Sequence, residues 1–339
     1  MQVVKVINCH AAGEVGDVVL QGLPIPRGDS LREISRQLSQ SPLRGFLMNE
    51  PRGGLFRHKN ILVPPQDPAA DFAFLIFEPE DEPPMSGSNC ICVATVILEM
   101  GLHPITEPIT ELKLESPAGL VEIIAECSQD RVNRVHFKNV PSFACKMDVP
   151  LQVEGLGKLQ VDTAYGGDSF VFVDAKSLGL SLQTDEGQTI ATLGAKIIAA
   201  ANSQIGFNHP GLPWLQHISF CQMVLPTRQE NGVKVGRQCV TIQPGKLDRS
   251  PTGTGCSARM ALMHARGELG IGDAFVGESI IGSRFNCRIV EETLVGDQQA
   301  IVSQVGGSGF ITGTQELWIR DDDPFPAGYR VSDTWPLKQ

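Results

Sequence analysis

The sequence lacks the patterns that mark secreted, membrane-spanning and nucleotide-binding proteins. No apolar run in its 339 residues reaches the length of a transmembrane helix, and the first residues, MQVVKVINCHAAGE, contain no apolar signal-peptide segment. Gly253-Thr254-Gly255 lacks the third glycine of a dinucleotide fingerprint. We therefore expect a cytoplasmic protein that spans no membrane and binds no nucleotide cofactor.

Basic clusters and metal-binding cysteine spacings are also missing. Charged residues make up 19% of the chain and the net charge is −10, which argues against binding to nucleic acid or to an anionic membrane. The nine cysteines form no C-x-x-C pair and no zinc spacing. Most lie in apolar runs, as Cys221 and Cys239 do, where a buried free thiol is typical. We expect no metal, and reduced thiols.

The residues that are present indicate a sizeable core and many turns. Hydrophobic residues make up 42% of the chain, and there are 35 glycines and 23 prolines. The order of elements is strands, helix, strands, then the same again, a mixed α/β plan of the α+β type without regular βαβ alternation. Predicted helices include 30–38, capped by Ser30, and 187–205; Ser279–Ile281 is predicted as a strand. Glu50 and Arg52 are interpreted as a structural ion pair.

One stretch, Asp248–Gly267, combines a tight turn with a helix. Thr252-Gly253-Thr254-Gly255 follows Pro251, and glycines there let the backbone approach a ligand closely. An apolar helical stripe comes next: Ala258, Ala261, Leu262 and Ala265. A loop of small hydroxylated residues therefore leads into a helix N-terminus, where free N–H groups and the helix dipole favour an anion.

A second stretch, Met85–Met100, repeats this pattern about half a chain earlier. Ser86-Gly87-Ser88 has the same order of hydroxyl, glycine and hydroxyl residues as Thr252-Gly253-Thr254, and a helical stripe follows. A strand candidate precedes each turn. The sequence therefore predicts duplicated halves. We expect Ser86 and Thr252 to face each other across one cleft, with both helix N-termini directed at one carboxylate.

These stretches resemble known active-site signatures. Asp248-Arg249-Ser250-Pro251-x-Gly253-Thr254-Gly255 and Met85-x-Gly87 are similar to the two signatures of the proline racemase family, which includes proline racemase, hydroxyproline 2-epimerase and trans-3-hydroxy-L-proline dehydratase. Further matching blocks follow in the family's order along nearly the whole chain: His10–Glu14, Asn49–Gly53, Leu62–Pro65, Gly166–Phe170, Ile311–Thr314 and Asp322–Phe325. The resemblance implies a diaminopimelate epimerase-like fold of two pseudo-symmetric domains, each a curled mixed sheet around a central helix, with the ligand between them.

The chain departs from the family pattern where the racemases carry two catalytic cysteines. Ser86 and Thr252 stand at those positions, and Ser88 replaces a histidine. The resemblance implies that Asp248 binds the amine of the substrate. It places Ser86 where the family's base stands, with Thr252 as a candidate proton donor or orienting group.

An aliphatic hydroxyl is a weak acid and needs an adjacent base to take part in proton transfer. Asp248, His10 and Glu14 are the candidates for that base, and the sequence leaves the choice open. His10 is also a candidate for the wall of the site. The backbone N–H groups of four further residues suit the substrate carboxylate, whose charge rises in a carbanion-like transition state. The four residues are Gly87, Ser88, Gly253 and Thr254.

Dehydration fits two hydroxyls better than racemisation does, because racemisation needs a tunable acid/base on each face. The family's dehydratases carry a threonine at the second position, as Thr252 does here. We therefore expect cofactor-independent dehydration of trans-3-hydroxy-L-proline to Δ1-pyrroline-2-carboxylate, by α-proton abstraction and loss of the β-hydroxyl. Two alternatives remain: a hydroxyproline 2-epimerase or proline racemase that uses a Ser/Thr pair, and a catalytically silent amino-acid-binding homologue.

Domain boundaries are expected near the middle and the end of the chain. Residues 1–175 with 315–339 form the first predicted domain, whose C-terminal tail crosses back, and residues 176–314 form the second. Ser177–Thr184 is the best linker candidate. For partners, we expect a small proline derivative as substrate, and a homodimer is the hypothesis for assembly.

Overall fold

The computed structural model describes residues 2–335 and divides the chain into two compact units. The first joins the residues up to Phe137 with those from Ser308 onward, and the second is Lys138–Gly307. These divisions differ from the sequence-based boundaries at 175/176 and 314/315. The reason is that β10 (Ser169–Asp174) pairs in parallel with β11 (Phe220–Val224), so one sheet includes strands from both sides of the expected boundary.

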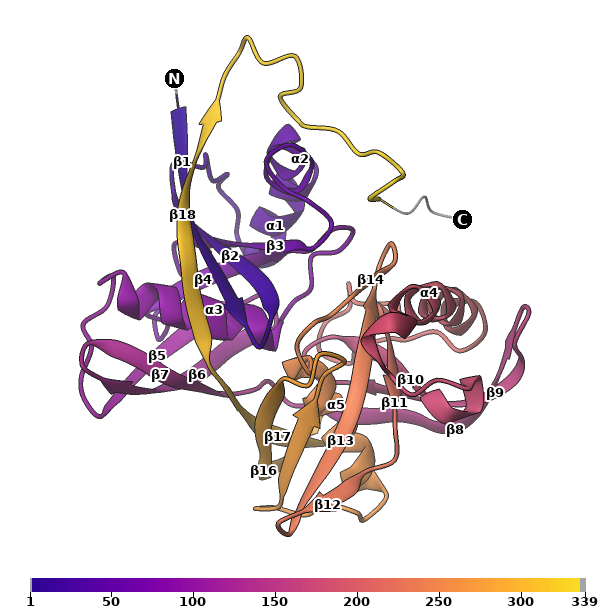
Figure 1. The fold of residues 1–339 in the computed structure, drawn as a ribbon. Helices are drawn as coiled ribbons and strands as arrows, with labels where there is room; N and C mark the ends of the chain where they lie inside the picture. Colours follow the sequence, from indigo (N-terminus) through magenta and orange to yellow (C-terminus); the bar gives the residue numbers. More distant parts are fainter. Residues whose placement is uncertain (1, 336–339) are drawn as a thin grey trace. The chain divides into compact units, whose positions relative to one another are not determined.

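The first unit is built on a mixed sheet with strand order β18-β1-β2-β3-β4-β5-β6. Only β2–β3 and β4–β5 among these pairs are parallel, and each needs a helical crossover. The strands and helices are β1 (Gln2–Ala11), β2 (Glu14–Gln21), α1 (Leu31–Ser39), α2 (Pro42–Met48), β3 (Arg57–Val63), β4 (Phe72–Phe77), α3 (Gly87–Glu99), β5 (Ile109–Ser116), β6 (Gly119–Ser128), β7 (Arg131–Lys138) and β18 (Gly309–Ile319). Figure 1 shows β18 running beside β1.

The second unit repeats this plan with strand order β8-β9-β10-β11-β13-β15-β16-β17. A bridge between Ser142 and Ile301 joins the segment before β8 to β17, so the sheet curls back on itself. Its remaining elements are β8 (Phe143–Val153), β9 (Gly157–Tyr165), η1 (Ala175–Leu178), η2 (Thr184–Glu186), α4 (Gly187–Gln204), β12 (Arg228–Glu230), β13 (Val233–Ile242), β14 (Lys246–Leu247), α5 (Gly253–Ala265), β15 (Ala274–Glu278), β16 (Arg284–Val295) and β17 (Gln298–Gly307).

The two units share one succession of strand pairings. In the first, β18-β1-β2 are antiparallel, followed by parallel, antiparallel, parallel and antiparallel pairs. In the second, β8-β9-β10 are antiparallel and the same succession follows as far as β16. In each, one crossover helix lies within the curled sheet: α3 packs on β1, β2 and β18, and α5 on β8, β9 and β17. The predicted α+β fold with a central helix in each half is confirmed.

Both central helices are buried around most of their circumference rather than along one stripe. Every residue of α3 from Gly87 to Leu98 is buried, and so is every residue of α5 from Gly253 to Met263. Their small and apolar side chains explain this, because a helix that is apolar on all sides belongs inside a core. Gly101 and Gly267, both at φ +70°, follow the two helices and end them.

Several local predictions can be compared with the structure. Ser30 caps α1, with its Oγ accepting the backbone N–H of Glu33 at 3.2 Å. The expected strand at Ser279–Ile281 is wrong, because the hydroxyls and backbone of Ser279 and Ser283 close a turn there. The expected ion pair of Glu50 and Arg52 is also wrong. Arg52 instead pairs with Asp323 at 2.8 Å, which ties two of the family-like blocks together within the first unit.

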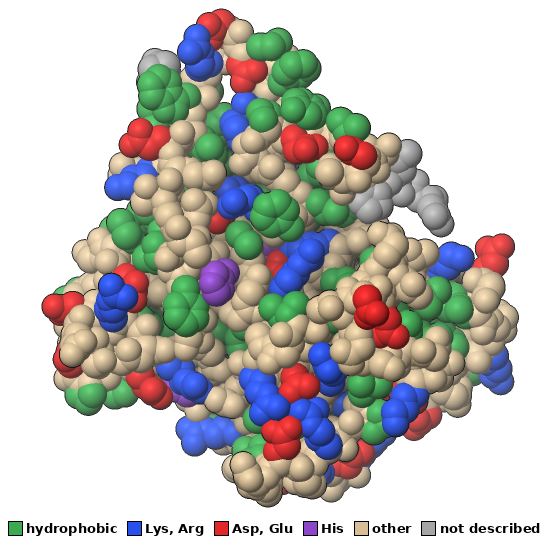
Figure 2. Space-filling model, viewed as in Figure 1, with side chains coloured by type: hydrophobic (Ala, Val, Ile, Leu, Met, Phe, Trp, Pro, Cys, Tyr) green, Lys and Arg blue, Asp and Glu red, His purple; other side chains and the backbone are tan. Residues whose placement is uncertain are grey.

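None of the helices among residues 2–335 is long and apolar enough to cross a membrane. Figure 2 shows acidic and basic side chains mixed across the face in view.

Candidate active site

The two hydroxylated turns stand at the starts of the two central helices. Ser86 is the N-cap residue of α3, and Thr252 is the N-cap residue of α5. Serine and threonine at this position usually accept a hydrogen bond from the first helical turn. Neither side chain does so here. The first-turn N–H groups have no acceptor within their helices, and the two hydroxyls are directed to other partners.

In the second unit, Thr252 is bonded to a carboxylate. Its Oγ1 donates to Oδ2 of Asp248 at 2.6 Å, while Oδ1 of Asp248 accepts the backbone N–H of Ser250 at 2.7 Å. The backbone N–H of Thr252 donates to Oγ of Ser250 at 3.0 Å. Asp248, Ser250 and Thr252 are all buried. The sequence motif therefore forms a compact hydrogen-bonded turn in which a carboxylate holds the hydroxyl of Thr252.

The backbone of Thr252 is strained. Its φ of 60° with ψ of 101° lies in a region that β-branched residues rarely adopt. Such outliers persist only where the surrounding structure holds them, and they gather at functional sites. The hydrogen bonds to Asp248 and Ser250 hold Thr252 in this conformation.

The block Gly166–Phe170 supports the start of α5 from the neighbouring turn. A Cβ at Gly166 would lie 2.1 Å from the carbonyl oxygen of Thr254 and 2.6 Å from the backbone nitrogen of Ala258. Only glycine lets the two backbones approach so closely. The carbonyl oxygen of Gly166 in turn accepts a hydrogen bond from Nδ2 of Asn139 at 2.7 Å.

In the first unit, Ser86 is bonded to an amide instead of a carboxylate. Nδ2 of Asn89 donates to Oγ of Ser86 at 2.9 Å and lies 3.1 Å from Nδ1 of His58. Oδ1 of Asn89 accepts from Asn60 at 2.9 Å. On the other side of the ring, Nε2 of His58 lies 3.3 Å from Oε1 of Glu14, so His58 lies between Asn89 and that carboxylate.

This network contains residues that the sequence did not single out. His58 and Asn89 are buried, and Glu78 is a second carboxylate beside His58, with its Oε1 3.5 Å from Nδ1. Asn89 could have been noticed from its place one helical turn after Ser86. His58 could not, because it comes from β3 and only the fold brings it to α3.

The structure places the other candidate residues as follows. Glu14 reaches the Ser86 network through His58, whereas the described contacts of His10 do not include Ser86. Nδ1 of His10 accepts the backbone N–H of Gly13 at 3.4 Å, and its ring lies 5.4 Å from that of Phe310. Of the four proposed carboxylate-binding residues, each is buried in the first turn of its helix: Gly87, Ser88, Gly253 and Thr254.

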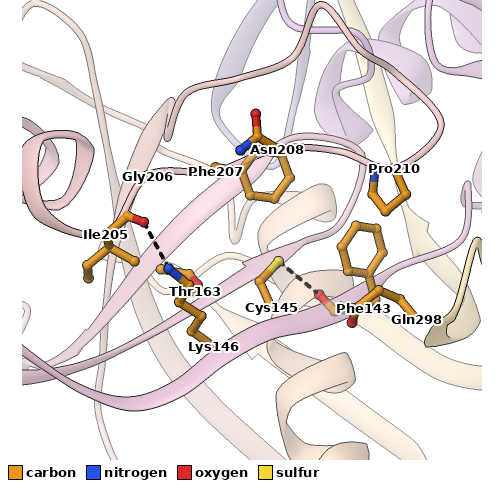
Figure 3. Close-up of a pocket in the computed structure, with 10 residues that line it drawn as sticks. All are labelled: Phe143, Cys145, Lys146, Thr163, Ile205, Gly206, Phe207, Asn208, Pro210 and Gln298. Atoms are coloured by element: carbon orange, nitrogen blue, oxygen red, sulfur yellow. Dashed lines mark hydrogen bonds between the residues drawn. The ribbon is translucent and has the colours of Figure 1, made fainter.

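A cavity in the second unit lies among other residues. Its volume is about 240 Å³ and its lining includes Phe143, Cys145, Lys146, Thr163 and Phe207. Figure 3 shows Lys146 bonded to the carbonyl of Ile205 rather than pointing freely into the space. Burial raises the pKa of the Cys145 thiol to about 12, which leaves it unreactive near neutral pH. This cavity shows no acid/base pair.

Metal-binding geometry is not found among the described residues 2–335, where no three His, Cys, Asp or Glu side chains cluster suitably. The cysteines are free, and all but Cys145 are buried.

The paired central helices and their hydroxylated turns define a class of protein built from two repeated halves. Comparison with known families and structures gives the class a name. The model of the proline racemase family matches residues 6–330, so the chain belongs to the proline racemase family.

Solved structures agree with this assignment. A hydroxyproline epimerase from Agrobacterium vitis, solved with bound trans-4-hydroxy-L-proline, is 34% identical with a TM-score of 0.94, covering 99% of this chain and 96% of its own. A probable proline racemase from Agrobacterium radiobacter, with bound carbonate, is also 34% identical with a TM-score of 0.93, covering 98% of each chain. A PhzF-family protein from Bacillus anthracis shares the fold alone, at 12% identity and a TM-score of 0.55, covering 94% of this chain and 100% of its own.

Proposed function

We propose that this protein removes water from trans-3-hydroxy-L-proline without a cofactor, giving Δ1-pyrroline-2-carboxylate. One observation carries the proposal: each central helix begins at a hydroxyl residue that does not cap it. The first-turn N–H groups are then available to a substrate carboxylate, whose charge grows as the α-proton leaves. The hydroxyls are available for proton transfer.

The chemistry of the two hydroxyls favours elimination. Loss of water needs an acceptor for the α-proton and a donor for the departing hydroxyl. Ser86 and Thr252 have different partners, an amide and a carboxylate, so the two turns are chemically unequal. An unequal pair suits a reaction with one base and one acid, whereas a racemase must run the same transfer in both directions.

Epimerisation at C2 of a hydroxyproline is the second candidate. It is favoured by the relative from Agrobacterium vitis, which is named as a hydroxyproline epimerase. The first step is common to both reactions, because each begins with removal of the α-proton. They differ in whether the proton returns to carbon or the β-hydroxyl departs.

Proton NMR in D2O separates these functions in one experiment. The parent protein is incubated with the 3- and 4-hydroxyproline isomers, and their α-proton signals are followed. Dehydration predicts loss of trans-3-hydroxy-L-proline with appearance of pyrroline-2-carboxylate. Epimerisation predicts a new set of ring-proton signals from the C2 epimer without water loss. Binding without loss of any α-proton signal would contradict both and identify a silent homologue.

A further inference from the structure

Two buried side-chain amides, Asn60 and Asn89, lie beside Ser86 in the first unit, and we call them the amide pair. Nδ2 of Asn89 lies 2.9 Å from Oγ of Ser86 and 3.1 Å from Nδ1 of His58. Oδ1 of Asn89 accepts a hydrogen bond from Nδ2 of Asn60 at 2.9 Å. Asn89 therefore presents one and the same amide group to the hydroxyl and to the imidazole.

The amide pair can turn over without losing the bond that joins its members. The oxygen and the NH2 group of an asparagine are similar in size, so they can exchange places. Oδ1 of Asn60 has no hydrogen-bond partner among residues 2–335. When both amides are reversed, Nδ2 of Asn89 donates to that oxygen, and Oδ1 of Asn89 faces Ser86 and His58. The site thus has two hydrogen-bond arrangements.

The proton on Nδ1 of His58 decides between these arrangements. An unprotonated Nδ1 accepts a hydrogen bond from the NH2 group of Asn89, whereas a protonated Nδ1 is itself a donor. Two N–H donors would then face each other across 3.1 Å, and the amide oxygen is the group that relieves this conflict. The charge of the ring is thereby coupled to the group that Ser86 meets.

Carboxylates lie on both sides of the His58 ring. Oε1 of Glu14, on β2, lies 3.3 Å from Nε2, and Oε1 of Glu78, which follows β4, lies 3.5 Å from Nδ1. All three residues are buried. Burial opposes a charged imidazole, and an opposite charge this close favours it. A second proton on the ring would therefore have a carboxylate beside each nitrogen.

Other titratable groups on these elements do not face the ring in this way. Burial raises the pKa of the Cys92 thiol on α3, so the thiol stays neutral near neutral pH. Lys59 and Arg57 flank His58 on β3, and alternate residues of a strand point to opposite faces. Both pair with Asp17, at 2.8 and 2.7 Å. Their charges lie on the far face of the sheet, away from α3.

We propose that His58, acting through the amide pair, is a positioning residue for Ser86. The pair turns an N–H donor toward the hydroxyl when Nδ1 is unprotonated, and a carbonyl acceptor when Nδ1 is protonated. A donor supports negative charge on Oγ, whereas an acceptor holds the hydroxyl hydrogen. No proton passes through the amides, because only their orientation changes. The change itself needs no substrate, and its part in proton transfer rests on the proposed function.

A thiol in place of the hydroxyl reports which group faces it. In Ser86→Cys, an N–H donor favours the thiolate and a carbonyl disfavours it, and the thiolate is the form that iodoacetamide alkylates. The rate is measured from about pH 5 to about pH 10, which spans imidazole and thiol ionisation. Mass spectrometry of the peptide that contains position 86 separates this reaction from that of the native cysteines.

We expect the alkylation rate to rise with pH more steeply than a single ionisation allows. The thiol should become easier to ionise as His58 loses its proton, with an additional gain of about tenfold from the exchange of an acceptor for a donor. A direct effect of the ring's charge has the opposite sign, because a positive imidazole favours the thiolate. Such an effect would make the profile shallower than a single ionisation.

Two further substitutions in the Ser86→Cys protein test the route through the amide pair. Asn89→Leu keeps the shape of the side chain without an amide, and His58→Phe keeps a ring without a titratable nitrogen. Each should reduce the profile to a single ionisation. His136→Gln is the matched control, since His136 lies on β7 and pairs with Glu126 instead, and it should leave the profile steep. Where Asn89→Leu does not fold, the sign of the effect in Ser86→Cys decides.

Each outcome supports or overturns the proposal. A steep profile that both substitutions remove supports it. A profile in Ser86→Cys that fits one ionisation or is shallower overturns it, and so does a steep profile that survives in folded Asn89→Leu. The proposed function fails separately, when the parent protein forms no product from any hydroxyproline although the Ser86→Cys profile is steep. Product formation together with a single-ionisation profile gives the reverse result.

Discussion

At the scale of single residues, the main feature is that the N-cap hydroxyls of Ser86 and Thr252 make no capping hydrogen bond to their helices. A capping hydroxyl would satisfy one of the N–H groups that a carboxylate needs, and removing a cap commonly costs about 1 kcal/mol. Ser86 and Thr252 forgo this bond in favour of Asn89 and Asp248. The absence of the capping bonds costs local stability, and it leaves the first-turn N–H groups and the hydroxyls available to a ligand.

The cysteines lead to a prediction about thiol reagents. Burial raises the pKa of the Cys90, Cys145 and Cys221 thiols, and Cys145, the least buried of the nine, rises to about 12. Thiolates are the reactive form, so the folded protein should react slowly with a disulfide reagent at pH 8 and keep its activity. Absorbance of the released thiolate measures the reaction.

Ser86→Cys provides the matched control for that experiment. It places a thiol at a helix N-terminus, where thiol pKa values fall, so one fast-reacting group should appear. Rapid inactivation of the parent protein by the reagent would show that a native cysteine takes part in the reaction.

At the scale of elements, the Gly166 turn closely approaches the N-terminal end of α5 and holds that end in place. Gly166→Ala would bring a methyl group against the backbone of Thr254 and Ala258. Overpacking of this kind costs about 1–3 kcal/mol and should displace the first turn of α5. We expect a lower midpoint in urea unfolding and weaker binding of hydroxyproline in calorimetry.

Gly187→Ala is the control for that substitution. Its Cβ would meet only a methyl group of Leu247 at 3.7 Å, so stability and affinity should be unchanged. Equal affinities for the Gly166 and Gly187 variants would place the carboxylate away from α5.

A buried ion pair links β2 to β3 beside the Ser86 network. Oδ2 of Asp17 accepts from Nζ of Lys59 at 2.8 Å and from Arg57 at 2.7 Å. Burial would raise the pKa of Asp17, but the Lys59 ammonium and the hydrogen bonds hold it below 3.8. Asp17→Asn leaves Lys59 buried without its partner and should lower the free energy of unfolding by about 3–5 kcal/mol at pH 7.

The sign of the pH dependence follows from the lowered pKa. The carboxylate contributes stability above pH 3.8, and this contribution is lost as the pH falls through the folded-state pKa. The difference in the free energy of unfolding between the parent protein and Asp17→Asn should therefore shrink as the pH falls. Asp322, which forms an exposed ion pair with Arg320, provides the control. Asp322→Asn should leave the free energy of unfolding unchanged. A difference in unfolding free energy that stays constant with pH would contradict this account.

Periodicity and turn residues were enough to predict much of the fold. They gave α1, α4 and the starts of both central helices, because these depend on local patterns of burial and on glycine turns. The Ser279–Ile281 turn was missed because two β-branched residues, Ile280 and Ile281, favour a strand locally. His58 was missed because its role depends on contacts between β3 and α3 that are distant in sequence.

At the scale of the whole molecule, the strand pairing shows the duplication that the two hydroxylated turns in the sequence predicted. Both units repeat one succession of parallel and antiparallel pairs around a buried helix. Their sites have nevertheless diverged, since one hydroxyl has an amide partner and the other a carboxylate. That Ser86 and Thr252 face each other across one cleft stays a prediction.

A crystal structure with trans-4-hydroxy-L-proline tests the central claim most directly, because the claim is that both hydroxylated turns bind one proline-type amino acid. The account predicts the ligand carboxylate on backbone N–H groups of Gly87, Ser88, Gly253 or Thr254, with Cα in contact with the hydroxyls of Ser86 and Thr252. A ligand found instead in the cavity beside Phe143, with both turns empty, would contradict it.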